Sequence, residues 1–203
     1  MLELEPPRHT RLRGLVLRAF TTRRIQALAP EITALAGDLV ERFPDGPFDL
    51  IEAFAKPIPV IVIARMLGVP ESMTDQLLAW SNAMVKVYQA GRSRADEEAA
   101  NTAAAEFAGF IRAYAARRRS APRDDLITEL LAAEADGERL SEPELVTTCI
   151  LLLNAGHEAT VHTIGNGVKA LLEHGIGAEA MAPDRIERTV EEVLRYDPPL
   201  HLF

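Results

Sequence analysis

The sequence has little cysteine and no long apolar run, and both shortages exclude classes of protein. Its 203 residues include one cysteine, Cys149, so no disulfide framework can form and a reducing, cytoplasmic setting is expected. Apolar runs such as residues 150–153 are far shorter than the roughly 20 residues that cross a bilayer. Residues 1–13 lack the apolar core of a signal peptide. We therefore expect no membrane association.

Aromatic residues are also scarce, and acidic residues outnumber basic ones. Aromatics make up 5% of the residues, and the formal net charge is -8, which argues against general binding to nucleic acid. Hydrophobic residues at 48% and charged residues at 26% are ordinary for a globular chain. The length suits one domain with a substantial core.

What the sequence does contain is helical periodicity. Apolar residues recur at steps of three and four over most of the chain, which predicts a mainly α fold with minor β structure. The expected architecture is an irregular array of helices around one long central helix. The helices are expected at residues 8–20, 22–43, 71–88, 93–119, 124–137, 141–174 and 184–196. Residues 56–68 instead combine β-branched side chains with two prolines, which locally favours a strand.

Short polar patterns set the expected helix ends. N-terminal capping is predicted for three pairs: Ser93 with Asp96, Ser141 with Glu144, and Asp184 with Glu187. Gly137 is expected to close the helix that precedes the central one. The arginines at 117–119 are interpreted as a solvated helix end, where positive charge suits the helix dipole.

The segment LLLNAGHEATVHTIG, residues 151–165, carries the first candidates for chemistry. A zinc site of the H-E-x-x-H type needs two histidines four residues apart on one helix face. His157 and His162 are five residues apart, so about 140° of helix rotation separates them. We therefore predict no zinc site and interpret each histidine as a satisfied or exposed polar residue.

Small side chains form a bare stripe along the same helix: Ala155, Gly156, Ala159, Thr160, Thr163 and Gly167. Glycine inside a helix costs about 1 kcal/mol relative to alanine, so a reason is expected. The stripe could pack closely against another helix, or a flat ligand could approach the backbone there. Thr160 can donate a hydrogen bond back to the carbonyl of Gly156. Glu158, beside it, is a candidate proton carrier.

Near the N-terminus, a basic helix offers a candidate anion site. His9 and Arg13 are four residues apart, so both project from one face and could hold a carboxylate. The alternative is a basic surface helix with the solvated neighbours Arg8, Arg11 and Arg18.

The last helix carries a candidate ion pair. Glu192 and Arg195 stand three residues apart, and Glu191 and Arg195 stand four apart. Either spacing allows a surface pair worth roughly 0.2–0.5 kcal/mol, so the spacing does not choose between them.

Three segments carry a family resemblance: PPRHTRLRGLVLRAFT at 6–21, NAGHEATVH at 154–162 and VEEVLRYDPPLHLF at 190–203. In this order they resemble the C helix, the oxygen-binding bend of the I helix and the E-x-x-R-bearing K helix of the cytochrome P450 family. The likeness is to the soluble bacterial haem-thiolate monooxygenases. It implies a helix at 56–68. It also implies that residues 1–203 form one truncated domain, the central portion of such a protein.

The resemblance implies a cofactor and roles for named residues. Haem b would be bound by His9, Arg13, Phe20, Ala155, Gly156, Ala159 and Thr160. Proton delivery would be the catalytic role of Glu158, Ala159 and Thr160. A structural pair would be formed by Glu192 and Arg195.

Ala159 departs from the family pattern. The family usually has a threonine at this position, whose hydroxyl helps to deliver protons to dioxygen. Thr160 is rotated by about 100° from Ala159, so it is not a direct substitute. The hypothesis is that a substrate hydroxyl or an ordered water completes the proton relay.

The axial cysteine of the family is a second departure. Cys149 precedes Gly156 by seven residues, roughly 10 Å along the helix, which would place it on the distal side of the haem. It is interpreted as a buried, inert core cysteine. The family's haem-cysteine loop and its N-terminal region are absent from the 203 residues, so no metal ligand is expected and the chain alone is expected to be inactive.

The resemblance implies a cytoplasmic oxidoreductase. It would insert oxygen into a small organic substrate with dioxygen and two electrons from a ferredoxin-type partner and its reductase. The alternative is a non-catalytic helical protein that binds a ligand or a partner. A DNA-binding regulator would need a recognition helix, and none is convincing.

Overall fold

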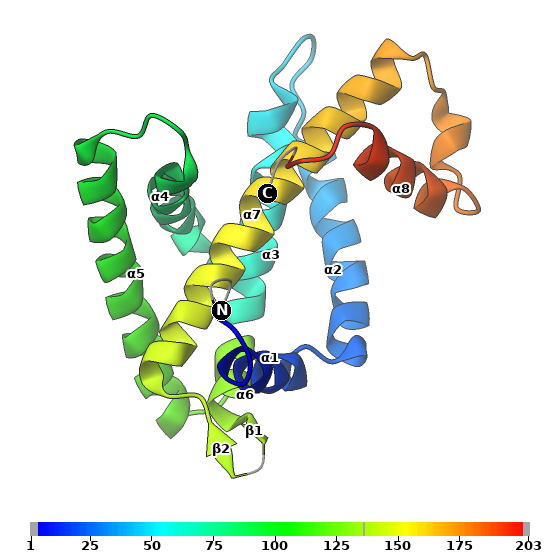
Figure 1. The fold of residues 1–203 in the computed structure, drawn as a ribbon. Coiled ribbons are helices and arrows are strands. Elements are labelled where there is room, and N and C mark those ends of the chain that lie inside the picture. The colour runs from blue at the N-terminus through cyan, green and yellow to red at the C-terminus, as the bar shows by residue number, and fades with distance from the viewer. Residues whose placement is uncertain (1–3, 136, 201–203) are drawn as a thin grey trace.

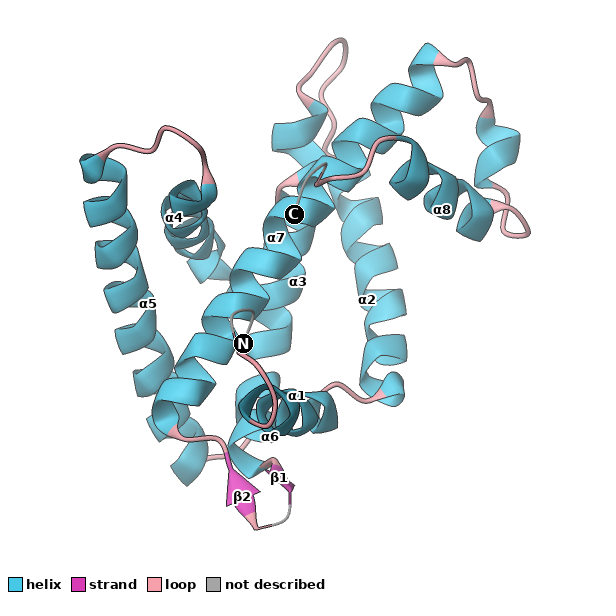
Figure 2. Ribbon diagram, viewed as in Figure 1, coloured by secondary structure: helices cyan, strands magenta, loops and turns pink. Residues whose placement is uncertain are grey.

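The computed structural model describes residues 4–135 and 137–200. Helices dominate these residues, and a single short hairpin is their only β structure (Figure 2). The α-helices are α1 (Arg8–Ala19), α2 (Thr22–Val40), α3 (Pro57–Leu67), α4 (Thr74–Val85), α5 (Arg94–Ser120), α6 (Leu126–Ala132), α7 (Glu142–Glu173) and α8 (Ile186–Tyr196). The shorter helices are η1 (Ile51–Ala55), η2 (Glu71–Met73), η3 (Lys86–Tyr88) and η4 (Ala178–Met181). The predicted mainly α fold is confirmed.

Helix α7 spans 32 residues and runs diagonally through the molecule (Figure 1). Helices α4 and α5 lie on one side of it, and α2 and α8 lie on the other (Figure 1). The predicted capping box fixes its start: the Glu144 carboxylate accepts bonds from the backbone N–H and the hydroxyl of Ser141, both at 2.9 Å. Pro143 fits in the first turn, because backbone N–H groups there make no bond inside the helix and proline has none to lose.

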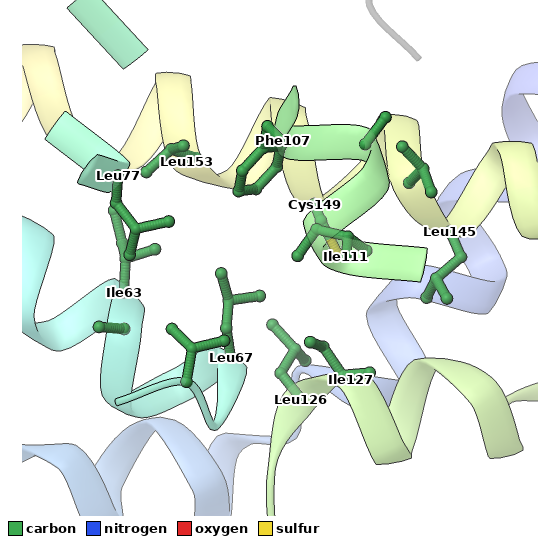
Figure 3. Close-up of a cluster of buried hydrophobic side chains, with 14 of the residues drawn as sticks. Ile63, Leu67, Leu77, Phe107, Ile111, Leu126, Ile127, Leu145, Cys149 and Leu153 are labelled. Atoms are coloured by element: carbon green, nitrogen blue, oxygen red, sulfur yellow. The ribbon is translucent and has the colours of Figure 1, made fainter. Parts of the chain in front are cut away.

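The main hydrophobic core lies where α3, α4, α5 and α6 meet the first half of α7 (Figure 3). Its central side chains are completely or almost completely buried: Leu67, Leu77, Phe107, Ile111, Leu126, Ile127, Leu145, Cys149 and Leu153. Burying each large aliphatic or aromatic side chain contributes about 1.5–3 kcal/mol. The core therefore anchors α7 up to Leu153, immediately before the predicted site.

Residues 57–67 form helix α3, so the strand favoured by local composition is wrong and the helix implied by the family resemblance is confirmed. Pro57 and Pro59 lie in the first turn, where backbone N–H groups have no partner inside the helix. Gly68 ends the helix with a φ of 74°, a left-handed conformation that glycine adopts without strain. Burial of most of its apolar side chains outweighs the weak helix propensity of its β-branched residues.

Helix α6 ends earlier than expected. Its last residue is Ala132, and the chain then forms the hairpin of β1 (Glu134–Ala135) and β2 (Glu138–Arg139). Gly137, with a φ of 77°, lies next to β2. The prediction that Gly137 closes a helix is therefore wrong, because a positive φ serves a hairpin turn as well as a helix end.

The arginines at 117–119 are not all solvated, so that interpretation is wrong for Arg118. Its side chain is buried, forms an ion pair with Asp125 and donates to the carbonyl of Gly68 at 2.7 Å. The Gly68 carbonyl lies 50 positions away in sequence, so no local pattern could reveal this contact.

Helix α8 begins at Ile186, and its N-cap residue, Arg185, makes no side-chain capping bond. The predicted cap by Asp184 with Glu187 is therefore wrong. The Thr189 hydroxyl instead donates to the Ala180 carbonyl at 2.7 Å, which ties α8 to η4. The helix ends at Tyr196, before the expected Asp-Pro stop. Within the described residues, no helix is both long and apolar enough to cross a membrane.

Candidate functional site

The middle of α7 presents small side chains to its surroundings. Ala155 is exposed, and Gly156 and Ala159 are half-buried. The Thr160 hydroxyl donates to the Gly156 carbonyl at 3.0 Å, as predicted, and the Thr163 hydroxyl donates to the Ala159 carbonyl at 2.8 Å. Both hydroxyl protons are therefore directed along the helix backbone.

Close packing explains the two glycines of the bare stripe on α7 but not all of its small residues. A Cβ atom on Gly156 would lie 3.0 Å from Cδ1 of Ile63 in α3, and one on Gly167 would lie 2.8 Å from Cγ1 of Val193 in α8. Close packing of neighbouring helices accounts for both glycines. It does not account for Ala155, which remains open to a ligand.

Glu158 lies on the accessible side of α7 beside His162. Glu158 Oε1 is 3.8 Å from His162 Nε2, and the two side chains are 42% and 52% exposed. The two groups form an ion pair only when the imidazole is protonated. Because the carboxylate reaches solvent, it can exchange protons with water, as a proton carrier must.

His157 points into the protein, with 4% of its surface exposed. Among the described residues, neither its ring nitrogens nor Oδ1 of Asn154 have a hydrogen-bond partner. Interpreting each histidine as satisfied or exposed is therefore wrong for His157 and right for His162. Burial lowers the pKa of His157, and the charges of His162 and Lys56 lower it further. No cluster of three or more His, Cys, Asp or Glu side chains in the described ranges is placed to hold a metal ion.

Helix α1 carries the candidate anion-binding pair. Arg13 is exposed and His9 is half-buried. Within the described part of the chain, neither side chain has an ion-pair or hydrogen-bond partner, so both are available to an anion. Phe20 is half-buried and packs on the main core. Helix α1 lies against α6 and β1 rather than on the middle of α7, so the two parts of the predicted site are not in direct contact.

Arg11 is not a solvated neighbour in this helix. Its guanidinium forms an ion pair with Glu144 of α7, and its Nε lies 3.1 Å from Glu138 Oε2 of β2. The interpretation of Arg11 as solvated is therefore wrong. Arg11 and Glu144 are 133 positions apart, and the sequence signalled only the capping role of Glu144.

In α8, the partner of Arg195 is Glu192 and not Glu191. Arg195 donates from Nε to Glu192 Oε2 at 2.7 Å and from a terminal nitrogen to Oε1 at 2.6 Å. This two-point bond lowers the pKa of Glu192 and raises that of Arg195. Both side chains are exposed.

Cys149 is completely buried in the core, as predicted (Figure 3). Burial raises the pKa of its thiol to about 12. The thiol therefore stays protonated at neutral pH, as expected of an inert core cysteine.

Curated relatives of the chain are bacterial cytochromes P450. The vitamin D(3) 25-hydroxylase of Pseudonocardia autotrophica is 45% identical over 98% of this chain and 49% of its own length. The cytochrome P450 monooxygenase PikC of Streptomyces venezuelae is 40% identical over 98% of this chain and 48% of its own length. No family model matches the chain.

Solved structures agree with these relatives. Ligand-free cytochrome P450 TbtJ1 superposes with a TM-score of 0.87 at 38% identity, over 95% of this chain and 51% of that one. P450BioI, in complex with a fatty-acylated acyl carrier protein, gives 0.88 at 35% identity over 95% and 50%. The helical array around a long central helix is thus that of about half of a cytochrome P450 structure. The chain belongs to the cytochrome P450 family, and it spans about half the length of the relatives it matches.

Proposed function

We propose that the chain is part of a haem-dependent monooxygenase that inserts one atom of dioxygen into a small organic substrate. The observation that carries this proposal is the open, small-residue turn at Ala155 and Ala159, in a chain that belongs to the cytochrome P450 family. Haem bound beside this turn would supply the iron chemistry that activates dioxygen.

The described residues fit such a group. A flat macrocycle could approach α7 at Ala155 because that methyl side chain is exposed and no helix of the described ranges covers it. On α1, the unpaired His9 and Arg13 would hold the two propionate carboxylates through charge-assisted bonds. Phe20 would pack beside the ring. Gly156 would contribute little beyond its packing on Ile63.

Proton delivery would start at Glu158, whose carboxylate exchanges protons with solvent. The next group is missing, because Ala159 has no hydroxyl and the Thr160 hydroxyl donates its proton to the Gly156 carbonyl. We infer that a substrate hydroxyl or an ordered water fills this gap.

Ala159→Thr tests this gap by adding a hydroxyl at the missing position. General acid–base groups contribute about 100-fold or more to a rate, so even partial use of the new hydroxyl should change the coupling of electron use to product formation. Because the 203 residues hold no axial cysteine, the measurement is product formed per electron pair consumed by a complete cytochrome P450 that carries this segment. The exposed Thr147→Val, earlier in α7, should leave it unchanged. An unchanged ratio in Ala159→Thr would contradict the inferred relay.

Electrons would come from a ferredoxin-type protein and its reductase. Relatives of the chain include a vitamin D(3) 25-hydroxylase and a polyketide biosynthesis cytochrome P450, which supports a small organic molecule as the substrate. The single, buried thiol supports a cytoplasmic location.

Hemin titration of the chain tests the haem site. Trp80, the only tryptophan, reports binding through fluorescence quenching, and the Soret band reports the haem itself. Ala155→Phe should weaken binding about ten-fold or more, because overpacking a close contact costs about 1–3 kcal/mol. The matched control is Ala105→Phe, at an exposed position of α5. Equal affinity of Ala155→Phe and the unaltered chain would contradict the proposal.

A further inference from the structure

Arg11 links three separate segments of the fold. Its side chain, 31% exposed, forms ion pairs with Glu144 in the first turn of α7 and with Glu138 in the hairpin. The Glu144 side chain is only 14% exposed, so its bond to Arg11 is shielded from water and screened less than a surface pair. This cluster is the ionic connection between α1 and the helix that carries the candidate haem-binding turn.

Both carboxylate oxygens of Glu144 are used. Oε1 accepts from Arg11, and Oε2 accepts from the N–H and the hydroxyl of Ser141 at 2.9 Å. Burial alone would raise the pKa of Glu144, but the Ser141 bonds and the charges of Arg11 and Arg8 outweigh it and lower the pKa. Glu144 therefore remains charged while it caps α7 and holds α1.

Helical geometry places the Arg11 contact away from the candidate anion site. Arg11 is two residues from both His9 and Arg13, which corresponds to about 200° of rotation. The apolar side chains Leu12 and Val16 bury a third face of α1. The apolar stripe and the Arg11 ion pairs together fix the rotation of α1 about its own axis, so the His9 and Arg13 face points in one direction only.

Glu144 also lies on the same continuous helix as Ala155, eleven residues or about 16 Å away along the axis. A rigid helix of this length transmits its position from its first turn to its middle. The bond at Glu144 thus fixes the position of the His9 and Arg13 face relative to the small-residue turn at Ala155. It does so although α1 does not pack on that turn.

We propose that Arg11 and Glu144 are positioning residues that hold α1 so that His9 and Arg13 face the propionates of the haem. The proposal rests on the proposed function, because it takes haem as the ligand. Neither residue touches the haem; the pair acts through the orientation of α1.

Hemin affinity in a double-mutant cycle tests the proposal. The variants are Arg11→Gln, Arg13→Gln and the double variant, with Arg18→Gln as the control because Arg18 is an exposed arginine of the same helix. Arg11→Gln should weaken hemin binding about ten-fold, the size of a typical coupling between contacting groups. It should cost clearly less in the Arg13→Gln background, because one of the two groups that it positions is gone and only His9 remains. Arg11→Lys should recover part of the affinity, and Arg18→Gln should lose none.

Amide hydrogen exchange gives a second measurement that does not need haem. Exchange of the α1 amides should accelerate in Arg11→Gln and also in Glu144→Gln, which retains an oxygen for Ser141, while the α5 amides stay as protected as before. Unchanged α1 exchange in both variants overturns the proposal.

The outcomes separate the two claims. If Arg13→Gln weakens hemin binding and Arg11→Gln does not, the positioning role is wrong and the haem site stands. If Arg11→Gln costs the same factor with and without Arg13, the role is general stability and the proposal is also overturned. If Arg13→Gln has no effect, the proposed α1 haem contact itself fails.

Discussion

At the residue scale, His157 is the most unusual group beside the site. Its neighbours Gly156 and Glu158 reach the outside of α7, yet the imidazole itself is buried without a hydrogen-bond partner among the described residues. An unpaired buried polar group of this kind costs about 1–3 kcal/mol. His157 therefore destabilises the folded chain at the turn where haem binding is proposed.

Stability should depend on pH through His157. Burial lowers its folded pKa below the usual 6.5. As the pH falls below 6.5, the unfolded chain takes up a proton that the folded chain does not, so the folded state loses stability. Urea unfolding at about pH 7.5 and about pH 5.5 measures this loss. His157→Leu should flatten the dependence, whereas His162→Gln, which alters an exposed ring, should retain most of it. A pH dependence unchanged by His157→Leu would contradict the account.

Local chemistry decided which site residues could be predicted. The Thr160 bond to Gly156 follows from helix geometry alone and was predicted. The spacing of His157 and His162 ruled out a shared zinc ligand face, but which histidine would be buried depends on the helices that surround α7. The bond of Arg11 to Glu144 and that of Arg118 to the Gly68 carbonyl join residues far apart in sequence, so no local pattern contains them.

At the element scale, the joint between α7 and α8 depends on close packing. Gly167 faces Val193, the Asn166 side chain donates to the Asp197 carbonyl at 3.3 Å, and His174 Nε2 lies 2.7 Å from the Tyr196 hydroxyl. These contacts place the helix that carries the Glu192–Arg195 pair against the end of α7.

Gly167→Ala should disturb this joint. The new Cβ would lie 2.8 Å from Val193 Cγ1, and a stiff valine cannot give way, so a loss of about 1–2 kcal/mol is expected despite better helix propensity. Val193→Ala in the same chain should recover most of it. Gly109→Ala in α5 is the control: open space surrounds that glycine, so it should gain up to about 1 kcal/mol. Urea denaturation gives the free energy of unfolding of the unaltered chain, the two single variants and the double variant. Equal gains in stability for Gly167→Ala and Gly109→Ala would contradict the packing argument.

Helix ends that depend on local bonds were predicted, and those that depend on distant packing were not. The capping boxes at Ser93 and Ser141 were predicted and are confirmed, because a cap bonds only to its own first turn. The strand favoured at 56–68 was wrong, because burial between helices decides that segment. The end of α6 was misplaced, because the hairpin that follows competes for the same residues.

At the scale of the whole molecule, exposed apolar side chains are concentrated between residues 172 and 200. Helix α8 contains no buried residue, and large apolar side chains there and nearby are exposed: Leu172, Ile176, Met181, Val190, Leu194 and Leu200. Exposed apolar surface of this kind is typical of contacts with further protein. The candidate haem-binding turn lies on the other part of α7, just beyond the well-packed core, where the described chain can hold its shape.

The central claim is that haem lies against the Ala155 turn of α7 and the His9–Arg13 face of α1. Amide hydrogen exchange of the chain with and without hemin tests it most directly, because it maps the contact onto the sequence. Hemin should slow exchange in peptides covering residues 151–163 and 8–14 and leave those of α5 unchanged, and Ala155→Phe should need about ten-fold more hemin for the same protection. Protection confined to other segments, or reached at the same hemin concentration in Ala155→Phe, would contradict the claim.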